Sequence, residues 1–110
     1  MKLEILNTEL NYVVFTKRAK AVSDFDVESA YEKYKDYKYI EISSMLLLDK
    51  FRVGVKRKEI SQFNLIVEDS DGKIYQDICT EYGKFNGEAY NAKVLGILDN
   101  NLDILCGFVE

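Results

Sequence analysis

The chain of 110 residues contains no histidine, no tryptophan and no proline. Histidine is the usual general acid or base near neutral pH and the commonest metal ligand. Its absence excludes catalytic triads and most metal-assisted hydrolysis from the functions that we expect. Average usage would place about five prolines in a chain of this length. Without them, no turn is fixed by a pyrrolidine ring.

A long apolar segment is also missing. The longest purely apolar run covers residues 45–48, whereas a helix that spans a bilayer needs about 20 such residues. The first ten residues are interrupted by polar side chains and do not resemble a secretory signal. We therefore expect a cytoplasmic protein that does not contact membranes. Its two cysteines, Cys79 and Cys106, are then expected to be reduced thiols buried in strands.

The known motifs for binding phosphates or metal ions are absent as well. Gly83 and Gly87 are not followed by the Lys-Ser or Lys-Thr pair of a phosphate-binding loop. The segment 69–72 lacks the oxygen ligands that a calcium loop needs at its first and twelfth positions, and we expect a turn between two strands there instead. A pair of catalytic carboxylates remains formally open among nineteen acidic residues, but no pattern places two of them in a cleft. We predict no catalytic residue, no metal site and no cofactor, and hence a protein that is not an enzyme.

The residues that are present indicate a folded globular protein. Apolar residues make up 47% of the chain and charged residues 31%, which is typical of a globular domain. The length predicts a single domain that spans residues 1–110.

The clearest helix is expected at residues 26–37. Val27, Ala30 and Tyr31 recur there at helical spacing, and Ser23 provides a capping oxygen before the first turn. A second short helix is favoured at residues 88–98, although a strand remains an alternative because the segment contains a glycine.

The remaining apolar segments predict strands. The sharpest alternation of apolar and other residues lies at residues 51–56, the pattern expected of a half-buried strand. Strands are predicted at residues 2–5, 10–17, 39–48, 51–56, 63–68, 73–79 and 102–108. Because the connections are short, we expect an α+β fold with a mostly antiparallel sheet of about six strands and the helix at 26–37 packed on one face.

The charge is distributed unevenly along the chain. The net charge is -4 overall, but residues 61–110 carry nine acidic and three basic side chains, whereas residues 1–60 carry ten acidic and twelve basic ones. An acidic half repels the phosphates of nucleic acid. It favours a protein partner with a basic surface and speeds the encounter with such a partner. Solubility alone is the simpler alternative.

Aromatic residues are interleaved with the acidic ones in this half. Rings supply contact energy at protein interfaces, and carboxylates supply long-range attraction. We therefore predict a partner-binding surface made of Asp69, Asp71, Tyr75, Asp77, Glu81, Tyr82, Phe85 and Glu88. The corresponding function is that of an inhibitor or immunity-type protein that caps a basic, nucleic-acid-handling partner.

A second function from the same sequence is a structural or assembly subunit. Such a protein would self-associate or add a strand to a neighbour. The apolar run at 45–48 supports this alternative, because one core of this size does not need to bury it entirely. The oligomeric state stays open in both cases.

Two basic clusters lie in the first half of the chain, and they form one patch only if they lie on the same side of the folded protein. A single patch would suit RNA or an acidic protein surface. The alternative, which we favour, is that charged side chains at strand ends discourage edge pairing. The clusters are Lys17, Arg18 and Lys20, and Lys56, Arg57 and Lys58.

Overall fold

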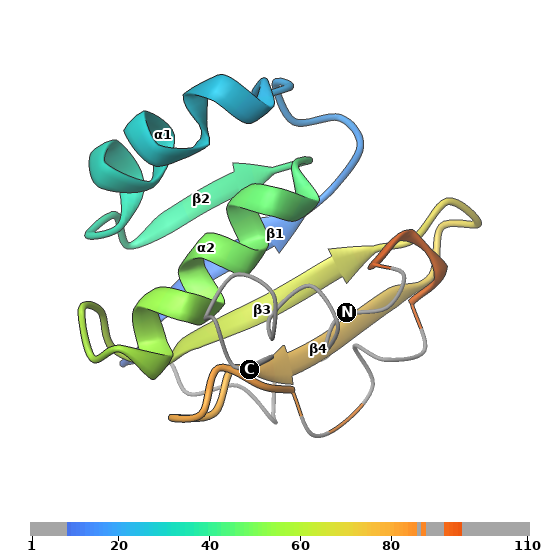
Figure 1. The fold of residues 1–110 in the computed structure, drawn as a ribbon. Helices are drawn as coiled ribbons and strands as arrows, with labels where there is room; N and C mark the ends of the chain where they lie inside the picture. Colours follow the sequence, from blue (N-terminus) through green and yellow to red (C-terminus); the bar gives the residue numbers. More distant parts are fainter. Residues whose placement is uncertain (1–8, 86, 88–91, 96–110) are drawn as a thin grey trace, which may run out of the picture.

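The computed structural model describes residues 9–85, 87 and 92–95. These residues form two α-helices and a four-stranded sheet, which confirms the α+β class; Figure 1 shows how they are arranged. The elements follow one another as β1 (Asn11–Phe15), η1 (Asp24–Asp26), α1 (Val27–Tyr34), β2 (Tyr39–Ile42), α2 (Met45–Lys56), β3 (Phe63–Glu68), β4 (Ile74–Ile78) and η3 (Lys93–Leu95), where η marks a single turn of 3-10 helix.

The sheet is mixed and mostly parallel. Its strands lie in the order β2-β1-β3-β4; β1 is parallel to both of its neighbours, and only β4 runs antiparallel, to β3. Our prediction of a mostly antiparallel sheet of about six strands is therefore wrong. The strands predicted at residues 2–5 and 102–108 lie outside the described residues.

The main error concerns residues 51–56, which we predicted as a strand and which form the second half of α2. Phe51, Val53 and Val55 alternate with Arg52 and Gly54 along the chain, but these two residues are buried as well. A helix that is buried on nearly all sides has no polar face to reveal its 3.6-residue period. Because α2 stands in place of a strand, it forms a crossover between β2 and β3, and such a crossover makes the two strands parallel.

The strand predicted at residues 39–48 is also too long, for a local reason. β2 ends at Ile42, and Ser44 caps the helix that follows. The Ser44 hydroxyl accepts a 3.1 Å hydrogen bond from the backbone N–H of Leu47, which satisfies one of the first N–H groups of α2. The apolar run at 45–48 therefore begins a helix instead of ending a strand.

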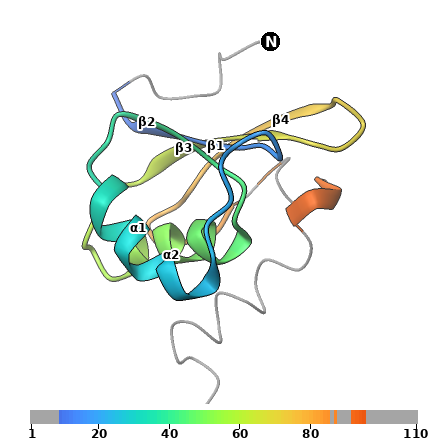
Figure 2. The same cartoon turned by 90° about the horizontal axis from the view of Figure 1, so that it is seen from above.

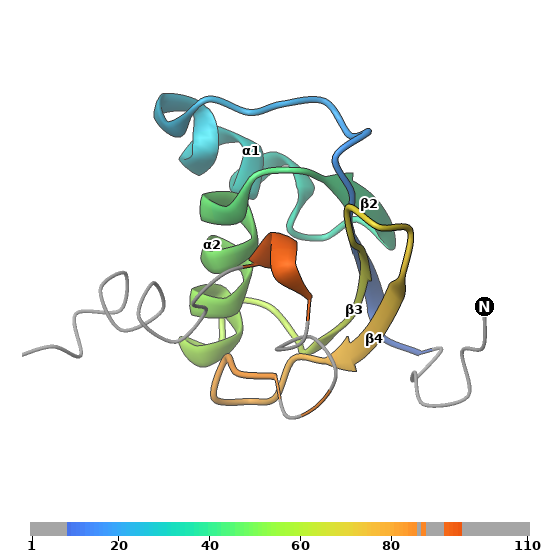
Figure 3. The same cartoon turned by 90° about the vertical axis from the view of Figure 1, so that its right-hand side faces the viewer.

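Both helices cover the same face of the sheet, so the described residues form two layers (Figures 2 and 3). Phe51 lies at the centre of the core between the layers. Its ring makes edge contacts with Tyr31 of α1, at 5.3 Å between ring centroids, and with Phe63 of β3, at 6.1 Å. The inward-facing strand residues that surround it are Val13, Phe15, Ile40, Ile42, Leu65 and Val67.

The two crossovers of the parallel strands have opposite hands. The step from β1 to β2 and the step from β2 to β3 run in opposite directions across the sheet, yet α1 and α2 lie on the same face. In Figure 1 the crossover through α2 is right-handed, and the one through α1 is left-handed. Right-handed crossovers account for about 98% of such connections. Because α2 already covers β1 and β3, α1 lies over β2 and beyond its outer side (Figures 1 and 3).

Several local predictions are confirmed. The helix expected at 26–37 is α1, the strand expected at 73–79 is β4, and the turn expected at 69–72 joins β3 to β4, with Gly72 at a φ of 85°. Of the second helix predicted at 88–98, only residues 92–95 are described, and η3 occupies three of them.

No helix of the described residues is both long enough and apolar enough to cross a membrane.

Candidate functional site

The residues that we predicted as a partner-binding surface fall into different environments. The structure buries Asp69, Asp77 and Phe85, half-buries Tyr75, and exposes Asp71, Glu81 and Tyr82, whereas Glu88 lies outside the described residues. The exposed ones belong to two separate places. Asp71 lies in the turn before β4, and Glu81 and Tyr82 lie in the turn after it. Asp71 is therefore separated from Glu81 and Tyr82 by the length of β4.

Asp69 has a structural role that its sequence context did not indicate. Its carboxylate accepts hydrogen bonds from the backbone N–H groups of Ser70 at 2.9 Å, Lys93 at 2.9 Å and Val94 at 3.2 Å. These bonds, above all the one from Lys93, lower the pKa of Asp69 below its ordinary value. Asp69 thus fastens η3 to the turn between β3 and β4.

Asp77 and Phe85 likewise connect segments inside the fold. The Asp77 carboxylate accepts hydrogen bonds from the backbone N–H groups of Ile78 at 2.9 Å and Gly87 at 3.0 Å. The ring of Phe85 lies under the guanidinium of the fully buried Arg52, 5.2 Å from the ring centroid. Both side chains are engaged by the protein itself.

Cys79 is a free thiol in the core, as expected from the sequence. Burial raises its pKa to about 12, so the thiol stays protonated at neutral pH and is a poor nucleophile. Cys106 lies outside the described residues.

The two basic clusters do not form one patch. Lys17, Arg18 and Lys20 follow the carboxyl end of β1, whereas residues 56–58 follow α2, which runs back toward the amino ends of β1 and β3. Arg18 is moreover paired with Glu68, at 3.0 Å between Nη2 and Oε2. The clusters therefore lie at opposite ends of the sheet.

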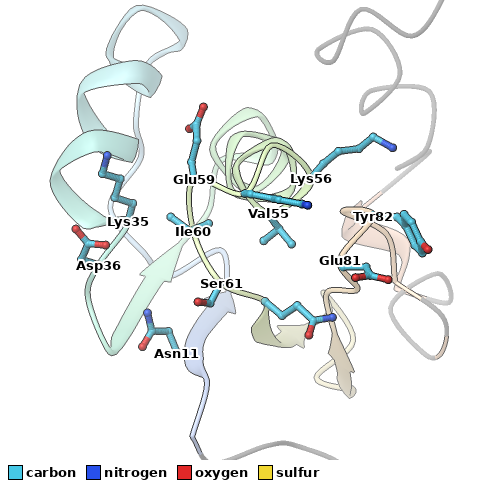
Figure 4. A pocket seen from close by; sticks show the side chains of 12 residues that line it. Asn11, Lys35, Asp36, Val55, Lys56, Glu59, Ile60, Ser61, Glu81 and Tyr82 are labelled. Carbon is cyan, nitrogen blue, oxygen red and sulfur yellow. The ribbon is translucent and has the colours of Figure 1, made fainter.

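A polar pocket of about 700 Å³ lies at the end of α2 (Figure 4). Its lining contains equal numbers of charged side chains of the two signs, namely Lys35, Lys56, Lys58, Asp36, Glu59 and Glu81. Several of them already have partners: Lys35 pairs with Glu32 at 3.0 Å, Glu59 accepts a hydrogen bond from Tyr31, and Lys56 lies over the ring of Tyr82. The balanced lining gives this pocket no preference for a charged ligand of either sign.

The described residues also contain no cluster of three or more acidic or cysteine side chains that could hold a metal ion. In the polar pocket, the hydrogen bond to Glu32 raises the pKa of Lys35 above its ordinary value. An ordinary surface ion pair explains that shift.

Among the described residues, the outer edge of β2 is not paired with another strand. The backbone N–H groups of Tyr12 and Thr16 donate to the carbonyl oxygens of Lys38 and Ile42, each at 2.8 Å. In a parallel ladder, alternate residues of a strand face the same neighbour. The N–H and C=O groups of Tyr39 and Glu41 therefore point away from β1, and β2 has no second neighbour among the described strands.

A groove of about 490 Å³ runs along this edge. Because α1 lies beyond the outer side of β2, it forms one wall of the groove, and β2 forms the other. We call this feature the β2 groove, and its apolar lining consists of Ala21, Val22, Ala30, Tyr34, Tyr37, Tyr39, Ile40, Ile42 and Leu47.

Exposed aromatic side chains gather around the β2 groove. Tyr37, which lines it, is 49% exposed, and Phe25 is 97% exposed next to the lining residue Asp26. Tyr39 is 54% exposed, but it alternates with the buried Ile40 and lies beside Tyr12, so its side chain lies on the opposite face of the sheet from the helices. The Tyr39 hydroxyl donates a 3.0 Å hydrogen bond to Glu41. Burial, followed by this hydrogen bond, raises the pKa of Tyr39. Large exposed aromatic side chains are typical anchors of protein interfaces.

The sequence contained only part of the signal for this site. Helical spacing does not distinguish Tyr31 from Tyr37, and the structure buries Tyr31 but leaves Tyr37 half exposed. The short strand at 39–42 was hidden within a longer predicted strand. An open strand edge depends on the order of strands in the sheet, and that order was not predicted.

No protein-family model, no curated protein and no solved structure matches this chain.

Proposed function

We propose that this protein is a protein-binding module that takes up one extended segment of a partner protein along the open edge of β2. The observation that carries the proposal is the coincidence of two features. The outward peptide groups of Tyr39 and Glu41 lie beside an apolar groove whose far wall is α1. In strand addition, backbone hydrogen bonds supply affinity, and pockets for alternate side chains supply specificity.

Binding of a peptide with micromolar affinity requires the β2 groove as well as the open strand edge. Tyr39 and Glu41 offer two N–H and two C=O groups, and each hydrogen bond contributes only about 0.5–1.5 kcal/mol net. Four such bonds fall short of the roughly 8 kcal/mol that corresponds to micromolar affinity. Apolar side chains of the partner, buried in the β2 groove, supply the remainder.

A single strand suits this site better than a second folded copy of the chain. A second copy that paired through its own β2, about a two-fold axis perpendicular to the sheet, would bring its own α1 to the same side. Because α1 lies beyond the outer side of β2 (Figures 1 and 3), the α1 helices of the two copies would compete for the space over the joined edges. An extended segment without a helix avoids this overlap.

Inhibition of a basic, nucleic-acid-handling partner stays a prediction. It is supported by the excess of acidic residues in 61–110 and by the exposure of Asp71, Glu81 and Tyr82. The two functions use different surfaces, because none of these three side chains lines the β2 groove.

Peptide selection with a backbone variant tests the proposal. Random peptides displayed on phage are selected on the purified protein, and the binders are then measured on Glu41→Pro and Glu41→Gln. Proline removes the outward N–H of residue 41 and leaves the hydrogen bonds to β1 intact, because those are made by Lys38, Ile40 and Ile42. Glutamine removes the charge but keeps the N–H.

We expect selected peptides to bind the unchanged protein and Glu41→Gln alike, and to bind Glu41→Pro at least about tenfold more weakly, the effect of roughly 1.4 kcal/mol. Circular dichroism and thermal unfolding confirm that the proline variant is folded. The proposal is wrong if no peptide is enriched, if binding ignores the proline, or if light scattering shows an oligomer of this chain that Glu41→Pro dissociates.

A further inference from the structure

Four charged residues line the β2 groove, and their side chains are not equally available to a ligand. The carboxylate of Asp26 accepts a 2.9 Å hydrogen bond from the hydroxyl of Ser23. The carboxylate of Glu41 accepts one from Tyr39. The two acidic groups of the groove are thus each engaged by a neighbouring hydroxyl.

The two lysines of the groove are in a different situation. Lys20 and Lys33 are exposed, and within the described part of the chain neither lies within ion-pair distance of a carboxylate. The ammonium of Lys33 lies over the ring of Tyr34, 5.1 Å from the centroid. A cation held in this way still has its own hydrogen-bond donors to offer to an anion.

The two lysines lie at opposite ends of β2. Lys20 directly follows Ala19, whose carbonyl accepts a 3.2 Å hydrogen bond from Ser43, just after the carboxyl end of β2. Lys33 lies in the last turn of α1, and the chain continues from there into the amino end of β2. A strand lying along β2 would therefore meet a positive charge near each of its ends.

On the basis of the strand-addition function, we infer that the partner segment has apolar side chains at alternate positions and an acidic residue on each side of them. Successive side chains of a strand point to opposite faces of the sheet. Every second side chain of the added strand therefore enters the β2 groove between α1 and β2. β2 has four residues, so the acidic residues flank an apolar stretch of about that length or slightly more, at roughly 3.3 Å per residue.

Charge-matched peptides test this inference. The probe is the acetylated, fluorescently labelled peptide Glu-Val-Thr-Val-Thr-Val-Glu. It is compared with the same peptide flanked by lysine instead of glutamate, and with a peptide of the same composition in scrambled order. Binding is measured by fluorescence anisotropy at low and at physiological salt, on the unchanged protein and on two double variants.

The first variant, Lys20→Glu with Lys33→Glu, reverses the charges of the groove. The matched control, Lys17→Glu with Lys73→Glu, makes the same change in net charge at exposed lysines outside the groove. We expect the glutamate-flanked peptide to bind the unchanged protein and the control about tenfold more tightly than the lysine-flanked peptide, with a smaller difference at high salt. The groove variant is expected to reverse this preference.

Equal binding of the two flanked peptides, or a preference that survives the reversal of Lys20 and Lys33, overturns the acidic specificity. That failure is distinguishable from failure of the proposed function. If phage-selected peptides without acidic residues bind and are sensitive to Glu41→Pro, strand addition stands and the inferred chemistry of the segment is wrong. If no extended peptide binds at all, strand addition itself is wrong.

Discussion

Tyr31 of α1 packs directly onto Gly54 of α2, with its hydroxyl in the space that a side chain at position 54 would occupy. The same hydroxyl donates a 2.9 Å hydrogen bond to Glu59, which follows α2. Burial and this hydrogen bond together raise the pKa of Tyr31 well above its ordinary value, so the phenol remains protonated. This contact sets how closely α1 approaches α2, and with it the position of α1 beside β2.

Replacing Gly54 by alanine is therefore expected to destabilise the protein by about 1–3 kcal/mol, the usual cost of overpacking a core. Urea unfolding measures this loss. In a Tyr31→Phe background the nearest atom to the new methyl group is gone, so we expect Gly54→Ala to cost less there. A cost that is the same in both backgrounds would show that the two residues do not oppose each other in this way.

The buried pair of Arg52 and Asp49 supports the turn that follows β4. Arg52 Nη1 lies 3.0 Å from Asp49 Oδ1, both side chains are fully buried, and Arg52 Nε donates a 2.8 Å hydrogen bond to the carbonyl of Gly83. We expect Arg52→Met to destabilise the protein by about 3–5 kcal/mol, because it leaves a buried carboxylate without its cation.

The double variant Arg52→Met with Asp49→Leu removes both charges together. Its stability should recover most of the loss, since well-packed apolar residues can replace a buried ion pair at little cost. Chemical denaturation of the two variants decides the point. If the single and double variants are equally unstable, packing around Arg52 matters more than its charge.

The pKa of Asp69 gives the stability a specific pH dependence. Its pKa is lowered in the folded state, so the carboxylate stabilises the fold above its ordinary pKa of about 3.9. This contribution is lost as the pH falls through the lower, folded-state value. We expect stability to fall more steeply below about pH 4 in the unchanged protein than in Asp69→Asn.

Thermal unfolding between neutral pH and about pH 2 measures this difference, with Asp71→Asn as the control, because the Asp71 side chain is exposed. Identical acid profiles for Asp69→Asn and the unchanged protein would mean that the bonds from residues 93 and 94 do not depend on the charge of Asp69. The order of stability at neutral pH should be unchanged protein above Asp69→Asn.

The sequence predicted those elements whose signals are local. The turn with Gly72, the strand after it and the helix that begins near Val27 each depend on neighbouring residues, and each is found. The order and direction of the strands depend instead on one helix, α2, which the alternation of Phe51, Val53 and Val55 disguised as a strand. The local sign of a helix in this segment is Ser44, whose hydroxyl caps the first turn of α2.

The predicted partner-binding surface, by contrast, was based on composition and not on the fold. Charge and aromatic content favoured residues 69–88 as the binding surface. In the structure, the carboxylates of Asp69 and Asp77 accept hydrogen bonds from backbone N–H groups of the same chain. Whether a carboxylate meets solvent or a neighbouring loop depends on tertiary contacts, which composition does not contain. The β2 groove exists only because the left-handed crossover places α1 beyond β2, and no sequence rule predicts that hand.

Amide hydrogen exchange, followed residue by residue by NMR, tests the open edge of β2 most directly, because it needs no partner. In the isolated protein, the amides of Tyr39 and Glu41 should exchange quickly, whereas those of Ile40 and Ile42, which face β1, should be protected. Addition of a selected peptide should then protect Tyr39 and Glu41 as well. If Tyr39 and Glu41 are already as protected as Ile40 without any partner, the edge is not free and the proposed function is wrong.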